Sequence, residues 1–410
     1  MKHGLAACFA LAILGACARA APPIATLTRT EAAPAASTAQ SERPQAERAS
    51  SVAPAEPTSP RAASLALVRE LDCGEAHLHL LPPKAFLSCG QELMLIEGDE
   101  LRTDPSYQRG IEPEQPSFLW EIVAMAGQWP DAIWLARNRS TESAAQGRIH
   151  RWTGQRWERV ADAMRDEPVS TVLPWTNQRA VALLQPPLGF GARLMPLGKP
   201  SFRAPRFTAP RLAHAHCRSR LRAEVQAALA SGDLLFAGGQ VCDVVSNHGD
   251  NDTTYAGLGV EHFTPDRAQS ELLLLDELPA VPPHAVWQAT ALAAIGPDSA
   301  LLAAQSVIDQ THTVGYLARW DGKSFHALPQ PFPGLVQRIW AESPDVLWAT
   351  DTQGRLWQGR GASFRRIAWE PPNPTDTEIT ELWARGPNDV WVLTHSKSHS
   401  KSAVFHGRVE

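Results

Sequence analysis

The sequence predicts an all-β protein: a single β-propeller of seven four-stranded blades that follows a signal peptide and a disordered tether. Two observations lead to this prediction. The segment SPDVLWAT at 343–350 returns as GPNDVWVLT at 386–394, which places Trp348 and Trp391 43 residues apart. All 14 tryptophans lie between Trp120 and Trp391. Tryptophan therefore recurs with the repeat, as expected for a residue that packs one structural unit against the next.

The N-terminus has the pattern of a bacterial export signal. Lys2 supplies a positive charge, and the apolar run at 4–16 has 13 residues, which is too short to span a hydrocarbon core about 30 Å thick. The segment LGAC at 14–17 resembles a lipobox, in which Cys17 receives lipid and becomes the new N-terminus. We therefore expect residues 1–16 to be a lipoprotein signal peptide. The alternative is ordinary cleavage after the ARA segment at 18–20.

A lipid on Cys17 would anchor the protein without spanning the membrane, because each buried CH₂ adds about 0.8 kcal/mol. Ala18 follows the cysteine where an aspartate would resemble an inner-membrane retention signal, so we expect an exported protein on the outer membrane. Residues 18–63 contain no aromatic residue and are rich in Ala, Pro, Ser, Thr and Glu. Such a segment buries too little apolar surface to offset its ordering entropy, which makes 17–63 a lipidated cysteine followed by a tether.

Charge and cysteine content restrict the function further. The net charge is −5, with 20% charged residues and no long basic run, which argues against nucleic acid as a partner. Four cysteines lie in the expected propeller domain, and in an oxidising compartment they allow three disulfide connectivities. Pairing of sequence neighbours is the expectation, with buried free thiols as the alternative. The candidates are Cys73 with Cys89 and Cys217 with Cys242.

The repeat itself predicts four short strands in about 40 residues. QRIWAE and VLWATD are rich in tryptophan and β-branched residues, and a Pro-Asp turn at 344–345 separates them. RLWQG and FRRIAW follow, each after a glycine-containing turn. Copies are expected at 75–117, 118–168, 169–212, 213–280, 284–333, 334–376 and 377–410, so residues 64–410 form the propeller domain. Six or eight blades are the alternatives.

Two segments need separate interpretation. RLRAEVQAALASG at 220–232 has apolar residues at helical spacing, but its place in the repeat predicts the first strand of a blade. The last copy shows only three strands before Glu410, whereas 64–71 is a strand-like segment without a blade. We expect this N-terminal strand to complete the last blade, because closure removes an exposed sheet edge.

The segments SPDVLWAT, GPNDVWVLT and ARWDGKSF (318–325) resemble the tandem repeats of uncharacterised exported bacterial β-propeller lipoproteins, which are loosely similar to Kelch propellers. The resemblance is strong in these segments and faint in 64–117 and 161–230. It implies a lipid-anchored propeller of the cell envelope and supplies no reaction. The Gly-His and Trp-Asp pairing of WD repeats, the Asp-box of sialidases and the motif of quinoprotein dehydrogenases are missing from the sequence.

Functional residues of a propeller lie in its loops rather than in its tryptophan core. The connections between second and third strands vary most in length and are expected on one common face, around the central channel. The candidate binding residues on that face are Arg139, Glu142, His248, Asp250, Asp252, Asp309, His312, Asp351 and Lys397, with His395 nearby. The repeat in HSKSHSKS at 395–402 indicates a solvated loop expansion.

Candidate metal and catalytic motifs are weak. The oxygen ligands at 247–253 lack the spacing of a calcium loop and are better explained as a solvated turn. His77-x-His79 and His214-x-His216 each place two imidazoles on one strand face without a visible third ligand. No metal site, cofactor or catalytic residue is therefore assigned.

Two classes of function remain. The favoured one is a monomeric, non-enzymatic module that binds a protein or glycan of the cell envelope through the variable loops. The alternative is a propeller hydrolase or lyase that acts on extracellular glycans, with Asp250 and Asp309 as acid and base. Catalysis would require two carboxylates about 5–9 Å apart in a concave pocket.

Overall fold

The computed structural model describes residues 61–111, 120–130, 132–141, 144–162, 167–175, 179–185, 193–198, 207, 211–212, 215–216, 223–245, 251–264, 270–275, 278–279, 282, 285, 287–308, 312–329, 334–361 and 363–409. The expected signal peptide, Cys17 and most of the tether lie outside this part of the chain. The described residues form 29 strands and one short 3-10 helix, η1 (Pro105–Gln108). Within this part of the chain, no helix is long and apolar enough to cross a bilayer.

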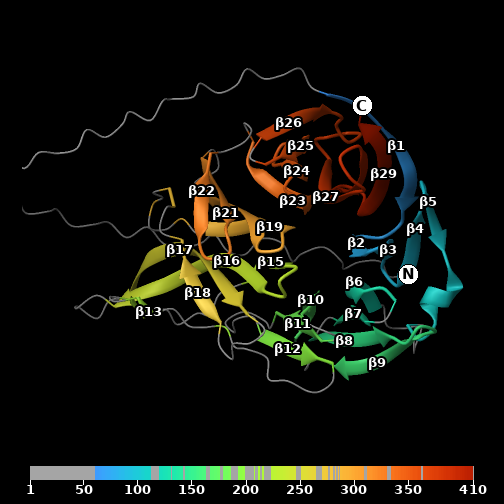
Figure 1. The fold of residues 1–410 in the computed structure, drawn as a ribbon, viewed down its shortest axis with the longest axis horizontal. Coiled ribbons are helices and arrows are strands. Elements are labelled where there is room, and N and C mark those ends of the chain that lie inside the picture. Colours follow the sequence, from blue (N-terminus) through green and yellow to red (C-terminus); the bar gives the residue numbers. More distant parts are fainter. Residues whose placement is uncertain are drawn as a thin grey trace, which may run out of the picture. The chain divides into compact units, whose positions relative to one another are not determined.

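The strands form a seven-bladed β-propeller, and the all-β prediction is confirmed (Figure 1). Blades 1 to 3 consist of β2 (Ala76–Leu81), β3 (Lys84–Cys89), β4 (Glu92–Glu97) and β5 (Glu100–Thr103); β6 (Trp120–Gln128), β7 (Ala132–Thr141), β8 (Ala144–Trp152) and β9 (Trp157–Asp162); and β10 (Val169–Pro174), β11 (Ala180–Leu184) and β12 (Arg193–Leu197). In the described residues, blade 3 has these three strands.

Blade 4 is the most elaborate sheet, because a small hairpin joins its long second strand. Its strands are β13 (Arg211–Leu212), β14 (Ala215–His216), β15 (Val225–Ala228), β16 (Leu234–Val245), β17 (Asn251–Phe263) and β18 (Glu271–Leu274). β15 pairs with β16 as the innermost strand of the blade. The segment at 220–232 thus contributes a strand rather than a helix, as its place in the repeat predicted.

Blades 5 to 7 are built from the clearest sequence copies. Their strands are β19 (Trp287–Gly296), β20 (Ser299–Val307), β21 (Thr313–Trp320) and β22 (Phe325–Leu328); β23 (Val336–Ser343), β24 (Val346–Asp351), β25 (Leu356–Arg360) and β26 (Ser363–Ala368); and β27 (Thr377–Ala384), β28 (Asp389–Ser396), β29 (Lys401–Val409) and β1 (Arg61–Leu71). The first strands of successive blades contact one another, and β27 contacts β2, so the ring is closed.

The N-terminal strand completes the last blade, as predicted. β1 pairs antiparallel with β29 from Ala63↔Val409 to Leu71↔Ser402. Its first two residues also pair, in parallel, with the outer strand of blade 6, through Arg61↔Ile367 and Ala62↔Ala368. One strand therefore joins blades 6 and 7 into a continuous eight-stranded sheet, a link that the repeat pattern did not indicate.

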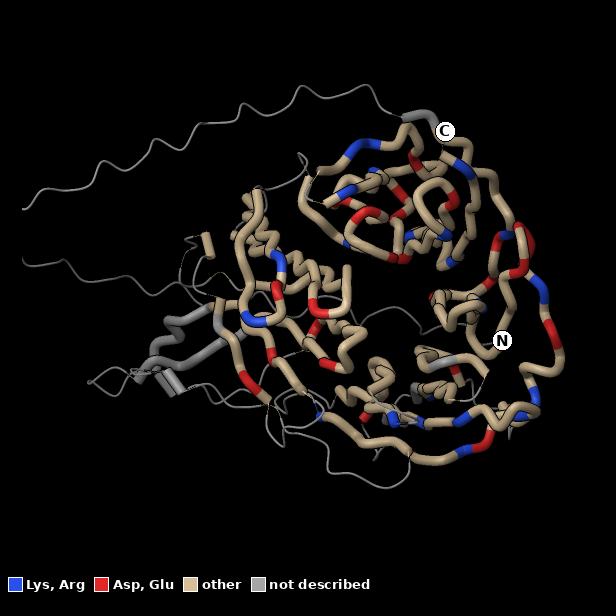
Figure 2. Tube along the Cα trace, viewed as in Figure 1, with Lys and Arg blue, Asp and Glu red and all other residues tan. Residues whose placement is uncertain are grey.

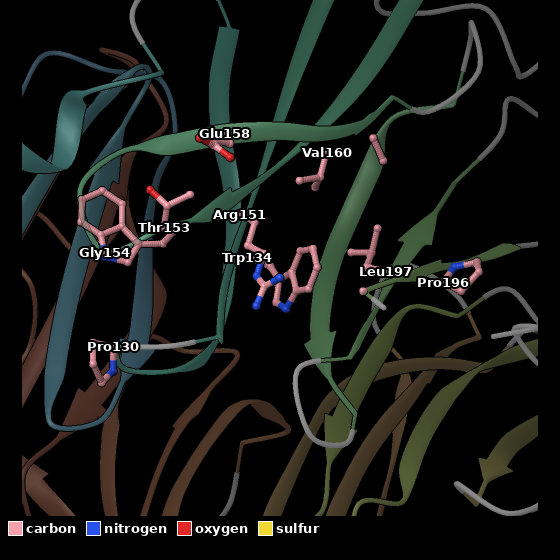
Figure 3. Close-up of a pocket in the computed structure, with 12 residues that line it drawn as sticks. Pro130, Trp134, Arg151, Thr153, Gly154, Glu158, Val160, Pro196 and Leu197 are labelled. Atoms are coloured by element: carbon pink, nitrogen blue, oxygen red, sulfur yellow. The ribbon is translucent and has the colours of Figure 1, made fainter. Parts of the chain in front are cut away.

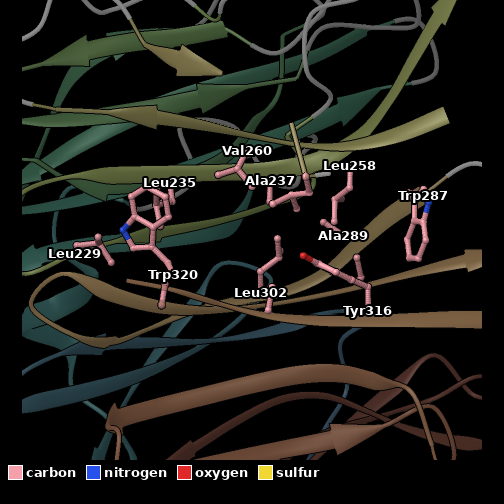
Figure 4. Packing of buried hydrophobic residues seen from close by; sticks show 14 residues of the cluster. Leu229, Leu235, Ala237, Leu258, Val260, Trp287, Ala289, Leu302, Tyr316 and Trp320 are labelled. Carbon is pink, nitrogen blue, oxygen red and sulfur yellow. The ribbon is translucent and has the colours of Figure 1, made fainter. Parts of the chain in front are cut away.

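Tryptophans of the repeat are buried between the blades. Trp348 and Trp391 are 0% and 1% exposed, so their assignment to the core is confirmed. Figure 4 shows the equivalent packing where blade 4 meets blade 5: Leu235 and Val260 lie against Leu302 and Trp320. Apolar side chains from both sheets exclude water from this contact, which is the main stabilising interaction between propeller blades.

Polar contacts at the inner strands add a second kind of link. Five inner strands shift register at equivalent places, which is the mark of a β-bulge. Side chains of the preceding blade donate to carbonyls at four of these bulges. The bonds run from Ser88 to Ile122, from Asn138 to Val169, from Thr290 to Val336 and from Arg338 to Thr380, at 2.8–2.9 Å.

The disulfide between Cys73 and Cys89 is present, with a Cα–Cα distance of 5.7 Å. Cys73 lies in the short connection from β1 of blade 7 to β2 of blade 1, and Cys89 ends β3. The bond therefore fixes the chain where it passes from the last blade into the first. Cys217 lies outside the described residues, as does the side chain of Cys242, so the second expected pair stays a prediction.

Candidate functional site

The second and third strands of every blade are joined at the same end of the ring, which we call the loop face. The first strands also begin at this end of the ring. Glu75, just before β2, and Pro168, just before β10, therefore lie at the loop face. Of the predicted binding residues, Glu142, His248, Asp250 and Asp309 lie outside the described part of the chain. Asp252 is in β17, and its side chain is also outside. The separation of carboxylates that would test the glycan-cleaving alternative therefore stays open.

Arg139 lies near the end of strand β7 at the loop face, close to two other arginines. The guanidinium carbons of Arg137, Arg139 and Arg148 lie 5.6, 5.8 and 4.2 Å from the ring centroid of Trp120. Arg137 is only 3% exposed. The three guanidinium groups therefore lie within cation–π distance of Trp120, the first residue of β6, and cation–π attraction favours this packing.

Asp351 was predicted to lie on the binding face, and the structure contradicts this prediction. It is 0% exposed, and its carboxylate accepts hydrogen bonds from the Trp357 indole at 3.0 Å and from the Arg355 side chain at 2.7 Å. The backbone N–H groups of Gln353 and Arg355 donate to the other oxygen. The segment TDTQG is a tight turn, so the carboxylate folds back to hold it instead of facing a ligand.

His312 and Lys397 are exposed on the loop face, and their role in binding stays a prediction. Lys397 approaches Glu378 on the first strand of the same blade, with a distance of 3.5 Å between charged atoms. The neighbouring residues Ser398 and His399 are exposed but ordered around Asp376. That carboxylate accepts hydrogen bonds from the hydroxyls of Ser396 and Ser398 at 2.6 and 2.9 Å, and these bonds lower the pKa of Asp376.

A cavity of about 570 Å³ opens at the loop face among the inner strands. Residues of β2, β6, β10, β15 and β27 line it, so five blades contribute to its walls. Its polar lining comprises Glu75, His77, His79, Asn138, Ser170, Thr171, Gln185, Gln226 and Glu381. No Lys or Arg is among the described lining residues. The described cavity wall is therefore rich in acceptors, and its carboxylates face histidines but no Lys or Arg.

Glu381 is the central polar group of this wall. Its two oxygens engage blade 1: one accepts the backbone N–H of Leu78, and the other lies 3.3 Å from Nδ1 of His77. Burial by itself would lower the pKa of His77. The hydrogen bond and charge of Glu381, together with the charges of Glu75 and Glu121, outweigh burial and raise that pKa above its ordinary value.

His79 lies two residues along the same strand in a different environment. It is 4% exposed, and its Nε2 is 2.8 Å from the hydroxyl of Ser88. That hydroxyl donates its proton to the carbonyl of Ile122, so it accepts a hydrogen bond from Nε2 of His79. Burial, followed by the nearby charge of His77, lowers the pKa of His79 to about 3.

The His77-x-His79 pair therefore has a structural explanation that does not involve a metal. The two rings are 6.4 Å apart and bond to different partners. Across the described residues, no group of three His, Cys, Asp or Glu side chains has the geometry of a metal site. His214 lies outside this part of the chain.

Sequence reasoning did not find the cavity, because its residues are dispersed from Glu75 to Glu381. The signal that was available is a polar residue at the inner strand of several copies: His77, Ser170, Gln226 and Glu381. The closing of the ring, which places Glu381 beside His77, turns them into one site.

No protein-family model matches this chain, and no curated protein matches it either. Similar solved structures are propellers. YCF48 bound to D1 peptide is 10% identical with a TM-score of 0.48, and the match covers 86% of this chain and 97% of that one. YCF48 from Cyanidioschyzon merolae is 10% identical, with a TM-score of 0.45 and coverage of 84% and 98%.

The β-propeller domain of the Trilobed protease from Pyrococcus furiosus is 11% identical, with a TM-score of 0.43 and coverage of 85% and 94%. At these levels of similarity the binding properties of those proteins are not transferred to this chain. What the described residues establish is a β-propeller with a polar cavity at its loop face.

Proposed function

We propose that this protein is a non-enzymatic binding module of the cell envelope, anchored by lipid on Cys17, whose cavity at the loop face receives a basic side chain of a partner protein. One observation carries the proposal: the described cavity wall contains carboxylates, amides and hydroxyls but no Lys or Arg. A cation is the guest that such a wall favours, because it gains charge-assisted hydrogen bonds there.

The volume supports a side chain rather than a whole domain. About 570 Å³ lies within the range of pockets that hold small groups. Glu75 supplies an exposed carboxylate at the rim, with 79% of its side chain accessible. The amides of Asn138 and Gln226 come from blades 2 and 4, and the hydroxyl of Ser170 comes from blade 3. A lysine or arginine that enters between them would be held from several sides.

The cation preference can be tested with two blocked peptides, acetyl-Ala-Lys-Ala amide and its Gln analogue, titrated against the full chain carrying Cys17→Ser. We expect the Lys peptide to bind at least about tenfold more tightly. Glu75→Gln should remove most of this preference. Glu100→Gln is the matched control, because Glu100 pairs with Arg102 on the outer strand of blade 1 at 3.0 Å. Equal binding of both peptides would contradict the proposal.

The anchor and the partner need separate tests. Incorporation of labelled palmitate into the wild-type chain, and its loss in Cys17→Ser, would support lipidation; labelling of both would contradict it. A pull-down from cell-envelope extract should recover the partner with the wild-type chain and not with Glu75→Gln. Deletion of 246–257 tests whether that loop also contributes, and recovery of the same proteins by every variant would contradict binding at the loop face.

A further inference from the structure

A second pocket lies at the end of the ring opposite the loop face, between blades 2 and 3 (Figure 3). It has a volume of about 650 Å³. Pro130 comes from the turn after β6, Gly154 comes from the turn after β8, and Gly198 follows β12. All three positions are at the end away from the cavity described above, so the two sites can be occupied independently.

The pocket presents one cation on a rigid support. The guanidinium carbon of Arg151 lies 5.5 Å from the ring centroid of Trp134, and Figure 3 shows the two side chains together in the pocket. Within the described part of the chain, no ion pair engages Arg151. Glu158 is its partner in the β8–β9 pairing, but that carboxylate accepts two hydrogen bonds from Arg156, at 2.8 and 3.1 Å. Among the described residues, Arg151 thus has no carboxylate that pairs with it.

The wall next to Arg151 is apolar and exposed. Val160 is 48% exposed, one of three large apolar side chains so exposed among the described residues. It lines the pocket together with Pro196 and Leu197 of β12. Exposed apolar surface beside a cation favours a ligand that carries a negative charge next to an apolar group.

The tryptophans of the pocket exclude one class of ligand. Sugar rings stack on open aromatic faces, whereas Trp134 and Trp152 are only 2% and 5% exposed. A terminal carboxylate is commonly held by several backbone N–H groups, but the N–H of Thr153 already donates to Arg156. The Arg151 guanidinium can instead pair with the carboxylate of an Asp or Glu side chain, which does not need several backbone N–H donors.

We propose that the pocket at Arg151 and Val160 is a second protein-binding site, which takes an acidic side chain flanked by apolar residues. The carboxylate would pair with the Arg151 guanidinium, and its apolar neighbours would cover Val160 and the exposed Pro196. The propeller would then hold a basic group at the loop face and an acidic, apolar segment at the opposite end.

The test uses the full chain carrying Cys17→Ser and four ligands. Two are blocked peptides, acetyl-Leu-Asp-Leu-Ala amide and its Asn analogue. The third is acetyl-Leu-Ala-Leu with a free C-terminus, and the fourth is methyl glucuronide. Binding is followed by two-dimensional NMR of the indole N–H groups and by calorimetry. We expect the Asp peptide to shift the Trp134 signal and to bind at least about tenfold more tightly than the other three ligands.

Variants separate charge from packing. Arg151→Gln should abolish the preference for Asp over Asn, and Val160→Ser should weaken both peptides equally. Glu75→Gln, at the opposite end of the ring, is the control that should keep the preference, and unchanged indole spectra without peptide would show that the variants fold. No binding of the Asp peptide up to about 5 mM, equal binding of Asp and Asn peptides, or tighter binding of the free C-terminus or of methyl glucuronide would each overturn the proposal.

Discussion

Glu381 of blade 7 accepts the backbone N–H of Leu78 in blade 1, across the junction where the ring closes. The same carboxylate contacts Nδ1 of His77 at 3.3 Å. One side chain thus satisfies a main-chain donor of the neighbouring blade and sets the charge of the imidazole beside it. Stability of the ring and electrostatics of the cavity depend on the same two oxygens.

Glu381→Ala should lower the free energy of unfolding by about 1–3 kcal/mol, because it leaves the Leu78 N–H without its acceptor. Urea denaturation followed by tryptophan fluorescence measures the change. Glu378→Ala is the matched control on the same strand. Its ion pair with Lys397 is exposed, so a loss of about 0.5 kcal/mol or less is expected. Equal effects of the two substitutions would show that the Leu78 contact is dispensable.

His77 should make stability depend on pH near neutrality. Its pKa is raised in the folded protein, so its contribution is complete below the unfolded pKa of about 6.5 and is lost as pH rises through the folded value. Unfolding free energies between pH 5.5 and 9 should show this loss in the wild type and not in His77→Gln. An NMR titration that places the His77 pKa below 6.5 would contradict the expectation.

His79 should have the opposite effect. Its folded pKa of about 3 lies below the unfolded value, so the folded state resists protonation and stability falls as pH drops below about 6.5. His79→Asn, which keeps a donor toward Ser88, should flatten this acid limb while lowering stability at pH 8. The two histidines of one strand therefore predict a maximum in stability between their limbs, and a monotonic profile would be inconsistent with it.

Reduction of the disulfide should weaken the junction between blades 7 and 1. The two cysteines are 16 residues apart, and a closed loop of that size contributes about 3 kcal/mol in the chain-entropy model. The double variant Cys73→Ala, Cys89→Ala should lower the urea midpoint by the corresponding amount, measured against wild type under non-reducing conditions. If reductant shifts the wild-type midpoint while leaving the variant unchanged, the effect belongs to this bond.

Asp351→Asn should destabilise blade 6 although it keeps the side-chain shape. The carboxylate is fully buried and accepts from both Trp357 and Arg355, so the substitution leaves the half-buried Arg355 guanidinium without its counter-charge. A loss of about 3 kcal/mol or more in unfolding free energy is expected. Exposed Asp345, which pairs with Arg360 at 3.0 Å, provides the control: Asp345→Asn should be nearly neutral.

The fold was predictable because each blade repeats a local pattern. Trp348 and Trp391 mark the second strand of two blades, and the place in the repeat correctly assigned even 225–228, whose apolar spacing is helical. The charge pattern added little, since Figure 2 shows acidic and basic residues interspersed over the blades.

The cavity was not predictable because it depends on ring closure. Nothing in the segment around Glu381 indicates that its neighbour is His77, about 300 residues earlier. The prediction that Asp351 belongs to the binding face was wrong for a different reason. Its position in a loop between second and third strands was right, but the tight turn buries its side chain. Arg355 and Trp357, four and six residues later, were the signal for an internal partner.

The parallel pairing of Arg61 and Ala62 with β26 has a mechanical consequence. Any tension applied to the chain N-terminal to Arg61 enters the propeller at these two residues and reaches the β29 pairing only after they detach. β1 would therefore yield in stages under load, first from blade 6 and then from blade 7. The ring would open only at the second stage. The short pairing with β26 would therefore break first under a pulling force, before the β1–β29 pairing that closes the propeller.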